Sequence, residues 1–408
     1  MNIVDGGITA PRGFMATGSH IGIKRVKKDI SIVTTDTPAV CAGCFTQSVV
    51  KAAHIIWDEN IVKNNKKVRG IITVSGNANA CTGEQGIRDN EKMAEVFSKE
   101  IGVDKYEIIT AATGIIGLEM PMDTIIKGIK DTVPHLSKSR DDARKAASGI
   151  ITTDTFIKEI AVEINIAGKA VRIGGMAKGS GMIHPNMATV LSFITTDINI
   201  TQELLQKALD YSIKETYNMI SVDGATSTND MAVVIANGKA ENTIIDEENE
   251  FFELFKETLY QIHLKFAKDI VHDGEGASKF MEAAVINAKS QEDAKILAKS
   301  IVTNDLVKTA LYGEDANWGR VAAAMGGSGA YFNPDKLNIY FASEKGCVLM
   351  MQNGRPIQFD ENYASEVLGE RDIKIVAELC DGEYTAKAWG CDLGHEYVRI
   401  NGEYRSRT

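Results

Sequence analysis

Hydrophobic and polar residues alternate along this chain with two periods, one typical of strands and one typical of helices. Alternating or short unbroken apolar runs predict early strands, at 31–35, 68–74, 106–112, 159–173 and 189–195. Apolar residues at helical spacing predict helices between and after them, at 93–101, from about 121, at about 201–217 and at about 247–271. Strand, turn and helix therefore alternate in the first third of the chain, as they do in an α/β protein.

The last third is richer in strands, which the pattern predicts at 337–341, 347–350, 372–377 and 396–400. No linker, low-complexity run or fixed-period repeat interrupts the sequence. A chain of 408 residues is too long for one ordinary core, so we expect two lobes or one large layered domain. The predicted fold class is α/β (α+β), with layered mixed sheets covered by helices.

Composition and charge narrow the class of protein. The chain is 44% hydrophobic and 25% charged, which is typical of a globular enzyme. Its net charge of −10 argues against nucleic-acid binding, and the short basic run at 24–28 is interpreted as a solvated loop. No apolar stretch approaches the roughly 20 residues that span a bilayer, and the N-terminus lacks the apolar core of a secretion signal. We therefore expect a cytoplasmic enzyme without nucleic-acid or membrane partners.

The six cysteines do not indicate a disulfide framework, which belongs to small secreted domains. Cys41 and Cys44 have the spacing of half a zinc site, but no second close pair follows to complete four ligands. We interpret them as small buried residues in a turn and predict no metal site.

One segment of the chain is unusual. Residues 174–181 hold four glycines, and the bent, glycine-rich stretch leads through a proline directly into the strand that begins at Thr189. A threonine hydroxyl is a weak nucleophile, but the α-amine of the same residue can activate it once that residue is an N-terminus. A free α-amine titrates at about 7.7–8.0, which suits a proton acceptor at neutral pH.

Several separated motifs resemble the ornithine acetyltransferases, also called glutamate N-acetyltransferases, of the cyclic arginine-biosynthesis route. They cover the whole chain, at 6–14, 75–83, 113–114, 152–155, 178–189, 273–277, 313–320 and 400–404. The resemblance implies that the chain cuts itself between Ala188 and Thr189, and that Thr189 then acts as the nucleophile. Residues 1–188 would form an α chain and residues 189–408 a β chain, assembled as an α2β2 heterotetramer.

The resemblance also implies a set of site residues. Thr113 and Gly114 match the family's oxyanion donors, where a strand ends. The substrate-binding positions, besides the nucleophile itself, match Thr152, Lys178, Glu275, Asn401 and Ser406. Lys178 would face a substrate carboxylate and Glu275 an ammonium, whereas Ser406 stands where the family more usually has threonine. Whether Thr152 or Thr153 points inward stays open.

The implied reaction is a ping-pong transfer between amino acids. N2-acetyl-L-ornithine would acetylate Thr189 and release ornithine, and L-glutamate would then take the acetyl group. The pocket should position glutamate and exclude bulk water, because an amine must outcompete water as the acceptor. The resemblance implies no metal or organic cofactor, and acetyl-CoA is a possible second donor that would make the protein an amino-acid N-acetyltransferase as well.

Two alternative functions use the same segment. A self-cleaving N-terminal-nucleophile amidase or aminopeptidase would pass the acyl group from Thr189 to water. A phosphate loop is the other alternative, but Lys178 precedes the final Gly-Ser, whereas a P-loop requires Gly-Lys-Ser/Thr. His184 is a further candidate base; we favour a structural role for it, because a proline follows and the α-amine already accepts the proton.

Overall fold

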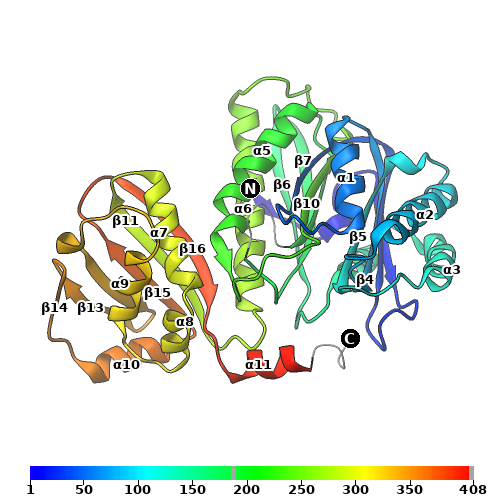
Figure 1. The fold of residues 1–408 in the computed structure, drawn as a ribbon. Helices are drawn as coiled ribbons and strands as arrows, with labels where there is room; N and C mark the ends of the chain where they lie inside the picture. The colour runs from blue at the N-terminus through cyan, green and yellow to red at the C-terminus, as the bar shows by residue number, and fades with distance from the viewer. Residues whose placement is uncertain (185–189, 404–408) are drawn as a thin grey trace.

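The computed structural model describes residues 1–184 and 190–403 and divides into two layered lobes (Figure 1). Each lobe has a mixed sheet covered by helices, which confirms the predicted α/β class. In the part of the chain that the structure describes, no helix has the length and apolarity needed to cross a bilayer.

The larger lobe contains a nine-stranded sheet, counted over the described residues. Its strands are β1 (Asn2–Ile3), β2 (Phe14–Ser19), β3 (Ile30–Phe45), β4 (Val68–Asn77), β5 (Ile108–Ile115), β6 (Lys158–Ile166), β7 (Lys169–Lys178), β8 (Leu191–Thr196) and β10 (Met231–Ala236). They lie in the order β1-β6-β7-β8-β10-β3-β4-β5, with β2 beside β3. The pairs β8–β10 and β4–β5 are parallel, and the other neighbours are antiparallel.

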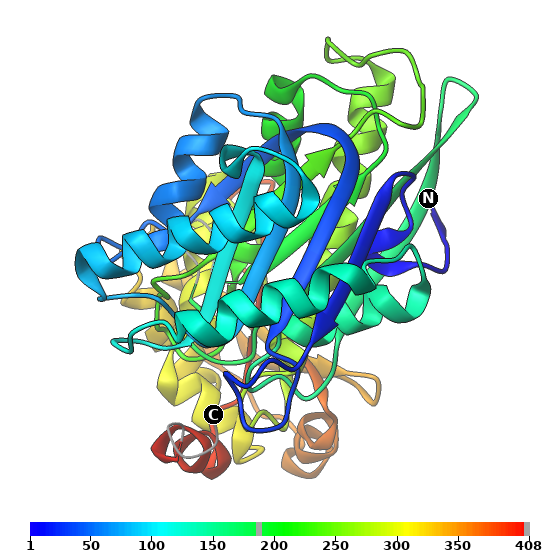
Figure 2. The same cartoon turned by 90° about the vertical axis from the view of Figure 1, so that its right-hand side faces the viewer.

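Helices cover both faces of this sheet (Figure 2). They are α1 (Ala53–Lys63), α2 (Gly83–Ile101), α3 (Met122–Thr132), α4 (Arg140–Ile150), α5 (Gln202–Glu215) and α6 (Glu250–His272). The sequence of β10 is apolar throughout because both of its faces are buried. Met231 and Val233 pack into the hydrophobic core that includes α1 and α4, whereas Ala232 and Val234 pack into the core that includes α5 and α6. A strand buried on both faces has no polar side to present.

The smaller lobe contains a seven-stranded sheet, again counted over the described residues, in the order β14-β13-β12-β15-β11-β16-β9. Its strands are β9 (Ile220–Ser221), β11 (Phe280–Ala288), β12 (Asn338–Ser343), β13 (Gly346–Gln352), β14 (Arg355–Pro356), β15 (Asp372–Glu378) and β16 (Tyr384–Cys391). Its helices are α7 (Gln291–Thr303), α8 (Asp305–Tyr312), α9 (Trp318–Gly326) and α10 (Glu361–Gly369). The strands predicted at 337–341, 347–350 and 372–377 are confirmed as β12, β13 and β15.

Two sequence predictions are wrong in detail. The strand expected at 396–400 is the helix α11 (His395–Gly402), which lies at the bottom of Figure 1, to the right of the smaller lobe. Its apolar residues do not mark a buried sheet face, since Val398 is 70% exposed. Cys41 and Cys44 are buried as expected, but they lie within the long strand β3 rather than in a turn.

The predicted cut falls between two neighbouring strands of one sheet. β7 precedes it and β8 follows it, and the two pair antiparallel, with Lys178 opposite Leu191. An α chain of residues 1–188 and a β chain of residues 189–408 would therefore share the sheet of the larger lobe. Ala188 and Thr189 themselves, like Ser406, lie outside the described residues.

Candidate active site

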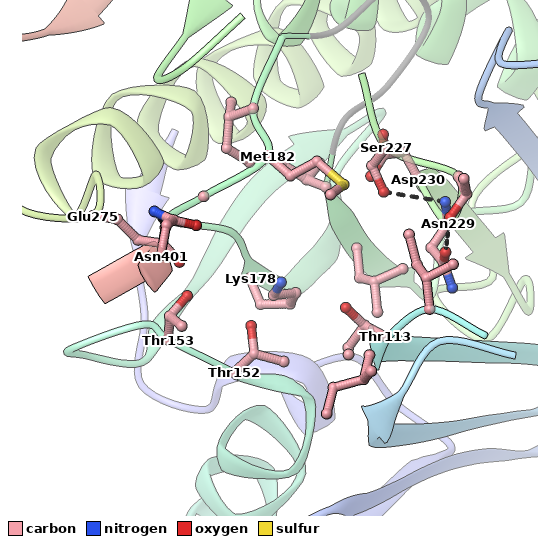
Figure 3. A pocket seen from close by; sticks show the side chains of 18 residues that line it. Thr113, Thr152, Thr153, Lys178, Met182, Ser227, Asn229, Asp230, Glu275 and Asn401 are labelled. Atoms are coloured by element: carbon pink, nitrogen blue, oxygen red, sulfur yellow. Dashed lines mark hydrogen bonds between the residues drawn. The ribbon is translucent and has the colours of Figure 1, made fainter. Parts of the chain in front are cut away.

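A cavity of about 340 Å³ opens where strands of the larger lobe begin and end (Figure 3). It is lined by the end of β5, the end of β7, the start of β8 and the residues just before β10. All the predicted site residues that the structure describes line it, namely Thr113, Gly114, Thr152, Lys178, Glu275 and Asn401. Val190, which directly follows Thr189 in the sequence, lines it too.

The predicted oxyanion pair lies at the end of β5. The backbone of Gly114 has φ 139°, and an added Cβ would lie 2.3 Å from the carbonyl carbon of Gly76 on the neighbouring strand β4. Only glycine fits a backbone that approaches its neighbour so closely. The hydroxyl of Thr113 makes no hydrogen bond within the described residues, so it is free to donate one to a ligand.

Asn229 holds this strand end against β10. Its Nδ2 donates to the carbonyl of Ala112 at 2.8 Å and to that of Ala78 at 2.5 Å. The carbonyl of Asn229 in turn accepts a 3.0 Å hydrogen bond from Nε2 of His54. Burial lowers the pKa of His54 to about 4, so its ring is neutral at pH 7 and keeps this donor. The residue before Thr113 is thereby fixed relative to the start of β10.

Asp230 is a cavity residue that the sequence did not reveal. Its carboxyl is buried, and Oδ2 has no hydrogen-bond partner among the described residues. Burial raises the pKa of Asp230 well above its ordinary value, although Ser227 and Lys178 act in the opposite direction. In the sequence, Asn229 and Asp230 have the pattern of an ordinary polar turn. Asp230 lies beside Val190 because β8 and β10 pair in parallel.

Lys178 is buried in the cavity without a fixed partner. Its side chain is nearly inaccessible, and no described residue forms an ion pair or a hydrogen bond with its ammonium. A buried charge of this kind needs compensation from its surroundings. One source of compensation is Asp154, whose pKa is strongly lowered: burial raises it, but the charges of Lys158 and Lys178 outweigh that effect.

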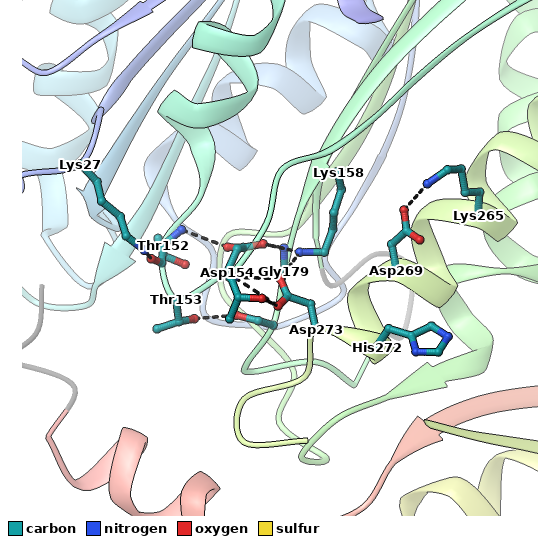
Figure 4. A network of polar contacts seen from close by, with 12 residues as sticks. Lys27, Thr152, Thr153, Asp154, Lys158, Gly179, Lys265, Asp269, His272 and Asp273 are labelled. Atoms are coloured by element: carbon teal, nitrogen blue, oxygen red, sulfur yellow. Dashed lines mark hydrogen bonds and ion pairs between the residues drawn. The ribbon is translucent and has the colours of Figure 1, made fainter. Parts of the chain in front are cut away.

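A buried network organises this side of the cavity (Figure 4). Lys158, which is fully buried, pairs with Asp154 at 2.8 Å and with Asp273 at 2.5 Å. Asp154 also accepts hydrogen bonds from the backbone of Thr152 at 3.0 Å and of Gly179 at 2.8 Å. Two carboxylates against one lysine leave one surplus negative charge beside Lys178. The network therefore balances Lys178 and fixes the backbone on which Thr152 and Lys178 stand.

Glu275 faces the cavity from the segment between α6 and β11. Its Oε2 accepts a 2.8 Å hydrogen bond from Asn401 of α11, and its backbone N–H donates to the carbonyl of Ser180 at 2.8 Å. A Cβ on Gly181 would lie 2.3 Å from the carboxylate, so this glycine makes room for Glu275. The sequence left open which of Thr152 and Thr153 points inward. The hydroxyl of Thr153 shares a 2.6 Å hydrogen bond with that of Ser180, whereas the hydroxyl of Thr152 has no hydrogen-bond partner among the described residues.

The structure does not support a functional role for two other candidates from the sequence, His184 as a base and the glycine-rich segment as a phosphate loop. His184 does not line the cavity, and its Nδ1 lies 3.2 Å from the hydroxyl of Ser221. Burial, aided by the charge of Lys299, lowers the pKa of His184 to about 4. The phosphate-loop alternative also lacks support: Lys178 ends a strand, and in the described residues the next helix is α5, which begins at Gln202.

Within the described residues, the cavity brings together a lysine and a hydroxyl that have no hydrogen-bond partner and a glutamate held by Asn401, an arrangement typical of an enzyme with a small charged substrate. A family model described as the ArgJ family matches residues 15–406 of this chain. The chain belongs to the ArgJ family, which confirms the resemblance found in its sequence.

Individual relatives agree with this assignment. The "Arginine biosynthesis bifunctional protein ArgJ" of Caldanaerobacter subterraneus subsp. tengcongensis is 48% identical over 406 residues and covers 100% of both chains. The protein of the same name from Thermotoga neapolitana is 47% identical over 397 residues, which are 97% of this chain and 99% of that one. A crystal structure of the argJ protein from Bacillus halodurans is 45% identical with a TM-score of 0.50, and the match covers 52% of this chain and 98% of the solved one.

Proposed function

We propose that this enzyme of arginine biosynthesis transfers the acetyl group of N2-acetyl-L-ornithine to L-glutamate through an acetyl ester of Thr189. The observation that carries the proposal is the gathering of six residues in one cavity, although they come from segments as far apart as Thr113 and Asn401. The cavity also includes Val190, so the predicted nucleophile adjoins it in the sequence.

The charged side chains suit the two ends of N-acetylornithine. The unpaired ammonium of Lys178 would bind the α-carboxylate, and the carboxylate of Glu275, oriented by Asn401, would bind the side-chain ammonium. The acetyl carbonyl would then lie toward Thr113. Glutamate offers the same carboxylate to Lys178 after ornithine has left.

The transfer needs no residue outside this set. The Thr189 hydroxyl would attack the acetyl carbon while its own α-amine accepts the proton. Thr113 and the Gly114 N–H would donate to the oxyanion, and one such donor is typically worth about 2.7–4 kcal/mol. Ornithine would leave with the proton as the ester forms, and the amine of glutamate would then break the ester and restore the hydroxyl.

A free α-amine on Thr189 requires a cut after Ala188. In the proposed reaction the Thr189 hydroxyl attacks the Ala188 carbonyl, the acyl group moves from nitrogen to oxygen, and water releases an α chain of 188 residues and a β chain of 408 − 188 = 220 residues. The Bacillus halodurans match supports this, because nearly all of that solved chain corresponds to only about half of ours. Two α and two β chains would form the heterotetramer.

A second donor belongs to the same proposal. The word "bifunctional" in the names of the relatives supports a second activity, and we propose acetyl-CoA as a second source of the acetyl group. Metal and organic cofactors have no step in this scheme. A cytoplasmic location stays a prediction.

Incubation of the purified protein with N-acetylornithine, with and without glutamate, tests the proposal. We expect N-acetylglutamate and ornithine in equal amounts, and only when glutamate is present. Release of acetate at the same rate without glutamate would instead identify an amidase or aminopeptidase that uses water as its acceptor.

A further inference from the structure

The bond exchange proposed above handles both amino acids as neutral amines. Ornithine leaves the acetyl group as a neutral amine, and glutamate attacks the Thr189 ester as a neutral amine. In water at pH 7, however, both carry an α-ammonium, because an α-amine is mostly protonated there. One further proton therefore has to reach the leaving amine in the first half of the cycle, and one has to be taken from the incoming ammonium in the second half.

Asp230 is a carboxyl in the cavity that the fold leaves without a partner. The residue lines the cavity, is 5% exposed, and its Oδ2 has no hydrogen-bond partner among the described residues. The other carboxyl among the described lining residues, Glu275, is bound by Asn401. A buried carboxyl oxygen without a hydrogen bond costs free energy, so its presence in a cavity indicates a ligand or a proton-transfer role.

The backbone fixes Asp230 at the start of β10. Its carbonyl accepts a 3.0 Å hydrogen bond from the backbone N–H of Thr46, and the N–H of the next residue, Met231, donates to the carbonyl of Val190 at 2.9 Å. Because β8 and β10 pair in parallel, Asp230 lies opposite Val190. The carboxyl is thus held beside the residue that follows the proposed nucleophile.

The reacting nitrogen of the substrate belongs to the same part of the cavity. It is bonded to the carbon that carries the α-carboxylate, which Lys178 would bind, and to the acetyl carbon, which would lie toward Thr113. Lys178 and Glu275 are the other titratable groups among the described lining residues. Burial raises the pKa of Asp230 well above its ordinary value, and the charge of Lys178 opposes this effect. A carboxyl with a raised pKa can hold and release a proton near neutral pH.

We propose that Asp230 is a catalytic residue that carries one proton through each cycle, from the ammonium of the incoming amino acid to the amine of the leaving one. This inference rests on the acetyl transfer proposed above. In the first half, the acetyl–nitrogen bond breaks as the Thr189 ester forms. The leaving nitrogen receives the hydroxyl proton of Thr189, through its α-amine, and the proton of Asp230, so ornithine departs as an ammonium.

The second half restores the proton. The Asp230 carboxylate takes one proton from the glutamate ammonium, and the resulting amine attacks the acetyl carbon. The acetyl–oxygen bond breaks, and a second proton of the amine returns to the Thr189 oxygen through the α-amine. N-acetylglutamate leaves, and both the hydroxyl and the protonated Asp230 are as they were at the start.

Two acceptors separate this role from a structural one. Wild type, Asp230→Asn and Asp246→Asn would be acetylated to completion with N-acetylornithine and freed of ornithine, and loss of the acetyl group at pH 7 would be followed by mass. Glutamate arrives as an ammonium, whereas hydroxylamine arrives neutral. Asp230→Asn should slow the glutamate reaction about hundredfold and the hydroxylamine reaction at most about threefold. Asp246→Asn, the same change at an exposed position of the larger lobe, should match the wild type with both acceptors.

The pH dependence adds a second readout. Relative to the wild type, the glutamate rate of Asp230→Asn should rise about tenfold per unit from pH 7 to 9, as more glutamate becomes a neutral amine. Asp230→Glu keeps a carboxyl and should retain more of the rate than Asp230→Asn. Equal slowing with both acceptors, no rescue at high pH, equal loss in the two variants, or an Asp230→Asn chain that stays uncut overturns the proposal. Glutamate-dependent exchange by the wild type reports the proposed function separately.

Discussion

The two lobes are built alike, yet they differ in what their buried lysines do. In the smaller lobe, Lys279 is buried and fully occupied: it donates to the carbonyls of Leu368, Gly369 and Glu370 and pairs with Glu314. In the larger lobe, Lys178 is equally buried, but no described residue accepts from its ammonium. Lys279 therefore stabilises the smaller lobe, whereas Lys178 has N–H donors for a ligand.

The same contrast holds for the strand ends. In the smaller lobe β12 and β13 are joined by a tight hairpin, whereas in the larger lobe β5, β7, β8 and β10 end or begin around an open cavity. Segments that connect the smaller lobe to the larger one contribute to this cavity, with Glu275 before β11 and Asn401 in α11. The candidate active-site residues are thus concentrated where the connecting segments meet the strand ends of the larger lobe.

The largest effect is expected for Thr189→Ala. Without the hydroxyl, neither the cut nor the acetyl ester can form, so the variant should be a single chain with no measurable transfer activity. Gel electrophoresis and the glutamate-dependent assay check this. Thr385→Ala, the same change at an exposed position on β16 of the smaller lobe, serves as the control and should leave both properties intact.

Replacing each of the two lysines with methionine tests whether Lys178 serves catalysis and Lys279 serves stability. Lys178→Met should lower kcat/KM by about three orders of magnitude, since loss of one partner of a buried ion pair costs about 3–5 kcal/mol. Its melting temperature should fall less than that of Lys279→Met, because it breaks no hydrogen bond or ion pair to a described residue.

Lys279→Met is the counterpart in the smaller lobe. It leaves several buried carbonyls without a donor, so its melting temperature should drop while the intact fraction retains its turnover. Calorimetry and kinetics on both variants give the answer. The opposite pattern, with Lys178→Met unstable and Lys279→Met inactive but stable, would contradict a catalytic role for Lys178 and a stabilising role for Lys279.

Thr113→Ala should have the next largest effect. It removes one oxyanion donor, so kcat should fall about 10²- to 10³-fold with little change in KM. Thr113→Ser keeps the hydroxyl and should recover most of the rate. An alanine variant with wild-type kcat would show that the Thr113 side chain has no part in the oxyanion site.

Among the replacements at the active site, Asn401→Ala should have the smallest effect on activity. It removes one hydrogen bond to Glu275, worth about 1 kcal/mol, so KM for N-acetylornithine should rise about fivefold at nearly constant kcat. Steady-state kinetics measure the split, and a fall in kcat alone would contradict an orienting role for Asn401.

The sequence predicted the fold where burial leaves a strong pattern. Strands buried on one or both faces, such as β4, which was predicted at 68–74, were predicted correctly, because apolar spacing records burial directly. Helix α4 was missed because its buried side carries alanines, at 143, 146 and 147, and only one large apolar residue, Ile150. The strand expected at 396–400 was wrong because its apolar residues lie largely on the surface of α11.

The site was predicted only through the resemblance to a family. Spacing alone could not show that Thr113, Lys178 and Glu275 meet, since the sheet order that joins them is set by long-range pairing. Asn229 and Asp230 were missed for the same reason: their role depends on β8 and β10 being parallel neighbours.

The proposed mechanism requires an acetyl ester on Thr189, and intact mass detects it directly. After incubation with N-acetylornithine and no glutamate, the protein should give two fragments, 1–188 and 189–408, with one added acetyl group on Thr189 of the second. Addition of glutamate should remove that group. A fully active protein that stays one unbroken chain of 408 residues, or that carries the acetyl group elsewhere, would contradict the account.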